Sequence, residues 1–180
     1  MAEGAPLQLM AHGQQAPIIV TALMGPADFA WADGLRRIHF PAERNWLPAH
    51  ITLFHHLPPS GEPEILTRLK RLTSAPPPPA MLSDVTNLGR GVAYRVNSPA
   101  LLLLRQELAD AFHGMLTPQD SASPRLHVTI QNKAPVEQAR ALFHELRAEF
   151  QPRPLTISGL AAWWYRGGPW EEIRSYRFRG

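Results

Sequence analysis

The chain has 180 residues, of which 44% are hydrophobic and 18% charged, values typical of a globular protein of one domain. It contains no cysteine, which excludes disulfide bonds and thiolate zinc sites, and no apolar run approaches the ~20 residues of a membrane-spanning helix. The net charge of +3 comes mainly from 16 arginines and favours an anionic ligand, but the chain lacks the dense basic tract of proteins that wrap long nucleic acids.

The N-terminal segment differs in composition from the rest of the chain. Residues 1–16 are rich in Gly, Ala and Gln and are predicted to form a flexible tail, with residues 17–180 as a single domain. This segment has neither the basic start nor the apolar stretch of a secretion signal, so we expect a cytoplasmic location.

Turn residues and apolar periodicity divide the first half of the domain into short elements. Proline suits the first turn of a helix, and a run of prolines can form neither a helix nor a central strand. In chain order, we predict a strand over Ile18–Met24, a helix from Pro26 to about Phe40, a strand over His50–Leu57, a helix with Ile65, Leu66, Leu69 and Leu72 on one face, a stiff connector over Pro76–Pro79, and strands over Met81–Leu88 and Val92–Val96.

The second half is divided in the same way, and it begins with a serine cap followed by a first-turn proline. We predict a helix from Ser98 and Pro99 to about Leu116, a loop over Thr117–Pro124, a strand over Arg125–Lys133, a helix begun by Pro135 with an apolar face from Val136 to Phe150, and strands over Leu155–Tyr165 and Glu171–Arg179.

The two halves repeat one order of elements. A strand with the pattern His-apolar-Thr-apolar is followed by a helix and then by a β-hairpin, first over about 48–97 and again over about 125–179. A repeat of architecture of this kind predicts two similar lobes facing each other.

The two strand motifs carry the chemistry. Side chains alternate along a strand, so His50 and Thr52 point to one side, as do His127 and Thr129. One neutral histidine can accept a proton while the other, protonated, donates one to a leaving oxygen, and both forms are populated near neutral pH. The threonine hydroxyls can donate hydrogen bonds to phosphate oxygens as charge develops there. We therefore predict a site for phosphodiester cleavage that needs no metal or other cofactor.

A single His-x-Thr occurs by chance in many chains, whereas two copies in matching strands are much more specific. The motifs HITL and HVTI, together with the closing stretch WWYRGGPWEEIRSYRF, resemble those of the 2H phosphoesterases, especially the bacterial 2'-5' RNA ligase-like branch. The resemblance covers roughly Pro17 to Phe178.

This resemblance implies a bilobal, pseudo-twofold α+β fold in which two antiparallel sheets flank a central cleft, with helices on the outside. It also implies a cyclic phosphodiesterase that acts on 2',3'-cyclic phosphate RNA ends or nucleotides, with reversible 2'-5' RNA ligation as a second activity. By match to the motif, His127 activates water and His50 protonates the leaving oxygen, although the pseudo-symmetry also allows the reverse. RNA ends or small cyclic nucleotides are the expected partners, and nothing in the sequence demands more than a monomer.

Five further residues are candidates for contact with substrate. Phe54 stands where many RNA-ligase-like members have an arginine; it could stack on a base or lie in the core. His56 and Lys133 follow their motif histidines by the same interval and could supply charge at the rim of the cleft, or be solvated. Tyr165 belongs to an aromatic cluster that walls the cleft or packs the lobes together, and Arg166 could reach a phosphate.

Two other interpretations remain open. The chain could be a module that binds RNA ends or nucleotides on the same fold without turnover, or an interaction protein without a small ligand. A zinc site from His50, His55 and His56 is geometrically poor, because His55 and His50 are expected on opposite faces of the strand.

Overall fold

A computed structural model of the chain describes residues 16–180. The predicted tail therefore lies outside the described residues, except for Ala16, which is buried. The elements of the first half are β1 (Ile18–Met24), α1 (Pro26–His39), the 3-10 helix η1 (Ala42–Arg44), β2 (Ile51–Leu57), η2 (Pro59–Gly61), α2 (Glu62–Leu72) and β3 (Ala80–Asn87). Those of the second half are β4 (Val92–Asn97), α3 (Pro99–Ala111), α4 (Pro118–Ser121), β5 (His127–Gln131), α5 (Val136–Glu149), β6 (Arg153–Leu155), β7 (Ile157–Trp164) and β8 (Glu171–Arg177).

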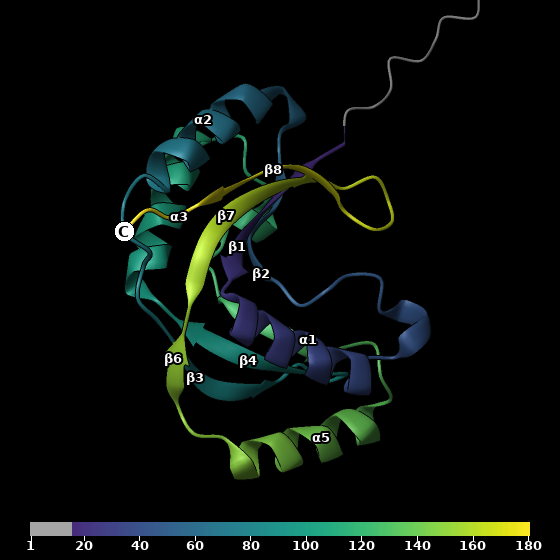
Figure 1. Ribbon diagram of the computed structural model, residues 1–180. Helices are drawn as coiled ribbons and strands as arrows, with labels where there is room; N and C mark the ends of the chain where they lie inside the picture. The colour runs from purple at the N-terminus through teal and green to yellow at the C-terminus, as the bar shows by residue number, and fades with distance from the viewer. Residues whose placement is uncertain (1–15) are drawn as a thin grey trace, which may run out of the picture.

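The strands form two antiparallel sheets of four strands each. The first sheet has the order β2-β1-β7-β8 and the second has the order β5-β4-β3-β6. In Figure 1, α2 and α3 lie beside the first sheet and α5 lies beneath the second. The fold is therefore α+β with two sheets, as predicted, and both motif strands, β2 and β5, are edge strands.

The two halves exchange strands. Each half runs strand, helix, strand, helix, strand, first from β1 to β3 and then from β4 to β7, interrupted by α4 and β6. The last strand of each half joins the sheet of the other half, because β3 pairs with β4 and β7 pairs with β1. The repeat units inferred from the sequence are thus not the lobes: the hairpin that follows each motif strand contributes to the opposite sheet.

Most predicted elements are present, and the main differences have local causes. The helix predicted to reach Leu116 ends at Ala111, and Gly114 adopts a left-handed backbone conformation with a φ of 82° that a helix cannot continue through. The segment predicted as a loop contains the short helix α4, whose Thr117 cap accepts a hydrogen bond from the backbone of Asp120. The strand predicted over Leu155–Tyr165 divides into β6 and β7, which belong to different sheets.

Strand β2 does not alternate regularly. Its pairing with β1 shifts twice, between Ile18 and Val20 and between Val20 and Thr21, which marks β-bulges. As a consequence Leu53 and Phe54 are both buried, and the exposed pair that follows is His55 and His56. The bulges therefore reverse only Phe54 and His55; the motif before them is regular, and His56 and Leu57 return to the original alternation.

Within residues 16–180, no helix combines the length and the apolar character that crossing a bilayer requires.

Candidate active site

The two motif strands approach each other where the edges of the two sheets meet. Strand β2 contacts β5 directly. Ile51 and Leu53, like Val128 and Ile130, turn into the core and are nearly or completely buried. The threonine of each motif is half-buried, His50 is half-buried and His127 is exposed. The alternation predicted for both motifs is therefore present.

Both histidine rings are held in the same way. The Nδ1 atom of His50 lies 2.8 Å from the carbonyl oxygen of Pro48, and that of His127 lies 2.7 Å from the carbonyl oxygen of Arg125. A carbonyl oxygen can only accept, so in each ring Nδ1 carries a proton and donates it. When the rings are neutral, Nε2 is therefore the unprotonated nitrogen of each ring and can act as a base.

The electrostatic setting of His50 favours its neutral form. Its pKa is lowered to about 4, chiefly because burial disfavours the charged ring, and the bond to Pro48 opposes this shift. Coulombic repulsion from Arg36, and from His127 and His55 whenever these are protonated, lowers the pKa further. The two motif histidines are thus close enough to influence each other, and His50 is uncharged at neutral pH in the free protein.

The threonine hydroxyls are available to a ligand. Among residues 16–180, neither Thr52 Oγ1 nor Thr129 Oγ1 has a hydrogen-bond partner, although the carbonyl oxygen of Thr129 is bound. These two hydroxyls, on the same strands as the two histidines, can serve as donors to the non-bridging oxygens of a phosphate.

Sequence reasoning missed Arg36, a buried cation beneath this site. Its Nη1 donates to Thr129 O at 3.0 Å, its Nε donates to Asn45 Oδ1 at 2.8 Å, and its guanidinium stacks on the ring of Phe40. Burial lowers its pKa to about 10, while Asp33 opposes this shift, so the side chain is still charged at neutral pH. Arginines 36 and 37 are adjacent in the chain, and no sequence signal separates the buried one from the exposed one.

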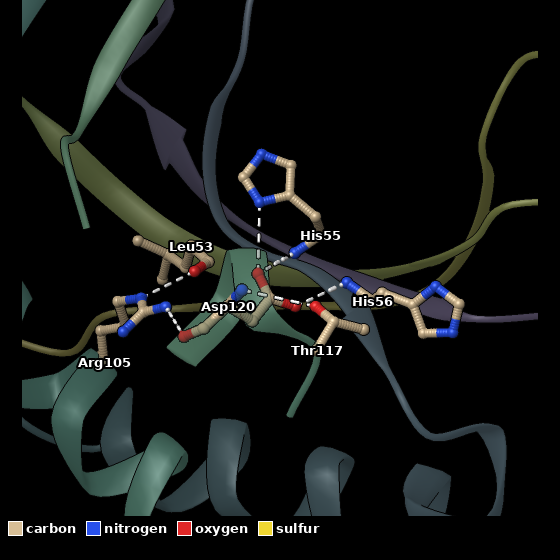
Figure 2. A network of polar contacts seen from close by, with 6 residues as sticks. All are labelled: Leu53, His55, His56, Arg105, Thr117 and Asp120. Atoms are coloured by element: carbon tan, nitrogen blue, oxygen red, sulfur yellow. Dashed lines mark hydrogen bonds and ion pairs between the residues drawn. The ribbon is translucent and has the colours of Figure 1, made fainter. Parts of the chain in front are cut away.

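Arg105 forms the corresponding hydrogen bond to the other motif strand, β2 (Figure 2). From α3 it donates to the carbonyl oxygens of Leu53 and Asp120, at 2.8 and 2.7 Å, and its guanidinium stacks on the ring of Phe54. Each motif strand therefore accepts a hydrogen bond from a buried arginine of the other half. Phe54 is completely buried beneath this arginine, so its predicted contact with substrate is wrong; the β-bulge turns it into the core.

An aromatic cavity of about 410 Å³ opens beside His50. The ring of Trp170 packs edge-on against His50 at 4.7 Å, and Trp163 lies next to Trp170. Trp46 and Phe29 complete the aromatic lining. A cavity of this size with flat apolar walls suits a planar group such as a nucleobase.

A second cavity, of about 470 Å³, adjoins the first and has a different character. Trp46, Leu47 and Trp170 line both cavities and separate them. The second is lined by five basic side chains, here named the basic pocket: Arg36, Arg44, His55, His56 and Lys133. Three of the secondary candidates, His56, Lys133 and Tyr165, therefore lie together at one cavity.

Arg166 does not lie at either cavity. Its Nε donates to Glu171 Oε2 at 3.1 Å across the last hairpin, and its guanidinium lies over the ring of Trp164. The side chain is thus directed along the hairpin, and its predicted contact with phosphate is not supported by this position. Among residues 16–180, no group of three His, Cys, Asp or Glu residues is placed to hold a metal ion.

Comparison with known proteins agrees with this architecture. The family model described as the 2'-5' RNA ligase superfamily matches residues 25–169. The structure is similar to that of TT0787 from Thermus thermophilus, with a TM-score of 0.61 and 17% identity over 91% of this chain and 98% of that one. It is also similar to E. coli LigT complexed with 3'-AMP, with a TM-score of 0.56 and 12% identity over 93% and 100%. LigT complexed with NADP+ gives a TM-score of 0.57 and 13% identity over 92% and 99%. No curated protein matches the chain.

Proposed function

The chain belongs to the 2'-5' RNA ligase superfamily, and from this premise we propose that it is a metal-independent phosphodiesterase that opens 2',3'-cyclic phosphates at RNA ends or on nucleotides. The observation that carries the proposal is the matched anchoring of His50 and His127 through Nδ1, which leaves two Nε2 atoms free at the junction of the sheets. General acid–base catalysis needs two such groups, one on each side of the phosphorus.

In the proposed reaction, Nε2 of His127 takes a proton from water as the water oxygen attacks phosphorus. One of the two bonds from phosphorus to a ribose oxygen breaks, and the protonated Nε2 of His50 gives its proton to that oxygen. The exposure of His127 suits contact with water. His50 is neutral in the free protein, so we propose that it gains its proton together with the substrate, because a bound phosphate anion raises the pKa of a neighbouring histidine.

The threonine hydroxyls and Arg36 stabilise the charge that develops on the phosphate. Thr52 and Thr129 donate to the non-bridging oxygens, while the buried guanidinium acts over a short distance through a medium of low dielectric constant. If a ribose 5'-hydroxyl attacks phosphorus in place of water, the same groups carry out 2'-5' ligation. The crystal structures of LigT with 3'-AMP and with NADP+ support a nucleotide as the ligand.

The alternative is a module that binds RNA ends or nucleotides without turnover. The four motif side chains weigh against it, since binding alone does not require both histidines to present a free Nε2.

The deciding experiment is an assay on adenosine 2',3'-cyclic phosphate with and without excess chelator. We expect turnover to a single monophosphate product at the same rate in both. Binding without turnover would favour the alternative module, and activity that is lost with chelator and restored by zinc or manganese would indicate a metal-assisted reaction.

A further inference from the structure

The basic pocket has more positive charge than one phosphate requires. Arg36, Arg44 and Lys133 are permanent cations, and no aspartate or glutamate of residues 16–180 lines the pocket with them. Within the same part of the chain, neither Arg44 nor Lys133 forms an ion pair. Arg36 has Asp33 nearby and His55 contacts Asp120, whereas Arg44 and Lys133 are without such partners in this part of the chain. Unpaired cations on the wall of a cavity are a feature of anion-binding sites.

Lys133 also has an unusual backbone. Its φ is 60°, and among residues 16–180 it is the only residue other than glycine in the left-handed region. A glycine would adopt this conformation without steric cost, whereas a lysine does so under strain. This backbone conformation occurs two residues after the end of β5, and the long cationic side chain of Lys133 lies on the wall of the basic pocket.

The two histidines of the basic pocket, His55 and His56, are anchored by Asp120 (Figure 2). Its two carboxylate oxygens accept the backbone N–H groups of His55 and His56, each at 2.8 Å, and Oδ1 also lies 3.2 Å from Nδ1 of His55. Asp120 is nearly completely buried behind the strand, while the side chain of His55 is 47% exposed. Figure 2 shows the two imidazole rings pointing in different directions from this anchor. The carboxylate thus holds the backbone that presents both rings to the pocket.

The basic pocket is also a neighbour of the candidate active site. Arg36 belongs to the pocket and binds the carbonyl oxygen of Thr129, and Trp170 belongs to the pocket and packs on His50. A molecule whose reacting phosphate lies between the motif histidines can therefore extend an adjacent group into the pocket.

We propose that the basic pocket binds a second phosphate group of the same substrate, the one on the 5' side of the nucleoside that carries the cyclic phosphate. This proposal rests on the proposed function and narrows it: the preferred substrate carries at least two phosphates, as an RNA 3' end does, and a nucleoside cyclic phosphate is a poorer substrate. A terminal 5'-phosphate and an internal phosphodiester both carry the negatively charged phosphate oxygens that such a pocket would bind.

The test compares three substrates: adenosine 2',3'-cyclic phosphate, its 5'-phosphorylated form, and a dinucleotide that ends in a cyclic phosphate. We expect kcat/KM to be about ten- to a hundredfold higher for the second, the third or both, because a charge-assisted contact is worth one to two decades in affinity. Comparison of the second with the third distinguishes a terminal phosphate from a chain phosphate.

Lys133→Gly is the sharpest variant, because it removes the cation and relieves the backbone strain. We expect it to lose most of the preference, to keep its activity on adenosine 2',3'-cyclic phosphate, and to melt no lower than the wild type. Arg44→Ala, at an exposed position, should act in the same direction. Lys70→Ala, which changes the chain's only other lysine, is the control and should leave the preference unchanged.

Calorimetry separates failure of this proposal from failure of the proposed function. Adenosine 3',5'-bisphosphate should bind the wild type more tightly than adenosine 3'-phosphate does, and Lys133→Gly should remove the difference, whether or not the protein turns over a cyclic phosphate. Equal kcat/KM for all three substrates would overturn the second-phosphate site. If the protein turns over none of the three, equal affinities for the two adenosine phosphates would overturn it. Turnover of cyclic phosphate by that same protein would leave the proposed function intact.

Discussion

The guanidinium of Arg36 donates a hydrogen bond to the carbonyl oxygen of Thr129, and so ties α1 of the first half to the motif strand of the second. The bond joins residues far apart in the sequence at the point where the two sheets meet. Because the donor is buried and charged, its removal leaves a backbone oxygen and the side chain of Asn45 without their partner.

Replacement of Arg36 by methionine should therefore lower the free energy of unfolding by about 2–4 kcal/mol, the cost of losing buried hydrogen bonds from a charged group. Urea denaturation at neutral pH measures this loss. Arg37→Met is the matched control: its side chain is 77% exposed, and its buried partner Asp33 keeps the hydrogen bond from the backbone of Ala49, so we expect a change of less than about 1 kcal/mol.

Replacement of either motif histidine by alanine should lower kcat on a cyclic phosphate by about 10²–10⁴-fold, because each change removes a proton-transfer group. The double variant His50→Ala/His127→Ala should be little worse than the poorer single, since acid and base act in one transition state. His113→Ala, a change to an exposed histidine outside both cavities, serves as control. Near-normal turnover by either single variant would show that other residues carry the chemistry.

Replacement of Thr52 or Thr129 by valine keeps the shape of the side chain and deletes one hydroxyl donor. We expect each variant to lose about 10–1000-fold in kcat with little change in stability, because neither hydroxyl has a partner among residues 16–180 whose bond would be broken. Melting temperature and steady-state rate, measured on the same samples, separate the two effects. An equal loss of rate and of folded protein would argue for a structural role.

The histidine pair should also have a distinct pH dependence. His50 has a pKa of about 4 in the folded protein against 6.5 for an unperturbed histidine, so between these values the unfolded chain binds a proton that the folded chain does not. Protonation of His50 in the unfolded chain should therefore lower the free energy of unfolding as the pH decreases from about 6.5 to 4. In His50→Ala the free energy of unfolding should decrease less over this pH range.

Proton NMR of the His50 ring measures its pKa directly. We expect the pKa to rise in Arg36→Met, which removes a nearby positive charge, and to rise again when inorganic phosphate binds. The rate profile should be bell-shaped, with limbs that belong to the pair of histidines. A free-protein pKa at or above 6.5 for His50 would contradict the environment described for it.

Much of the local structure follows from short-range signals in the sequence. Ser98 does cap α3, and its hydroxyl accepts from the backbone of Leu101, with Pro99 in the first turn. Likewise, the alternation in HITL and HVTI suffices to place both threonines on the side away from the core. These features depend on neighbours within a few residues, which is the range over which sequence patterns are informative.

The position of Phe54 shows where such patterns fail. Strict alternation puts this residue on the face of His50, but two bulges in the pairing of β2 with β1 turn it inward beneath Arg105. A bulge depends on the partner strand and on the packing below it, and neither is visible in the sequence of one strand. The burial of Arg36 and the anchoring of β2 by Asp120 depend on long-range packing in the same way.

The exchange of β3 and β7 determines how the molecule is assembled. Strand β3 can pair only after the second half has been synthesised, because both of its partners, β4 and β6, lie there. One edge of β1 likewise stays unpaired until β7 has been synthesised. The strand connectivity resembles that of a strand-swapped dimer, with the two halves of one chain in place of two copies and the turn around Gly89 as the link between them. Each sheet thus contains strands of both halves, and a hinge motion that separated the sheets would have to move both crossing connections.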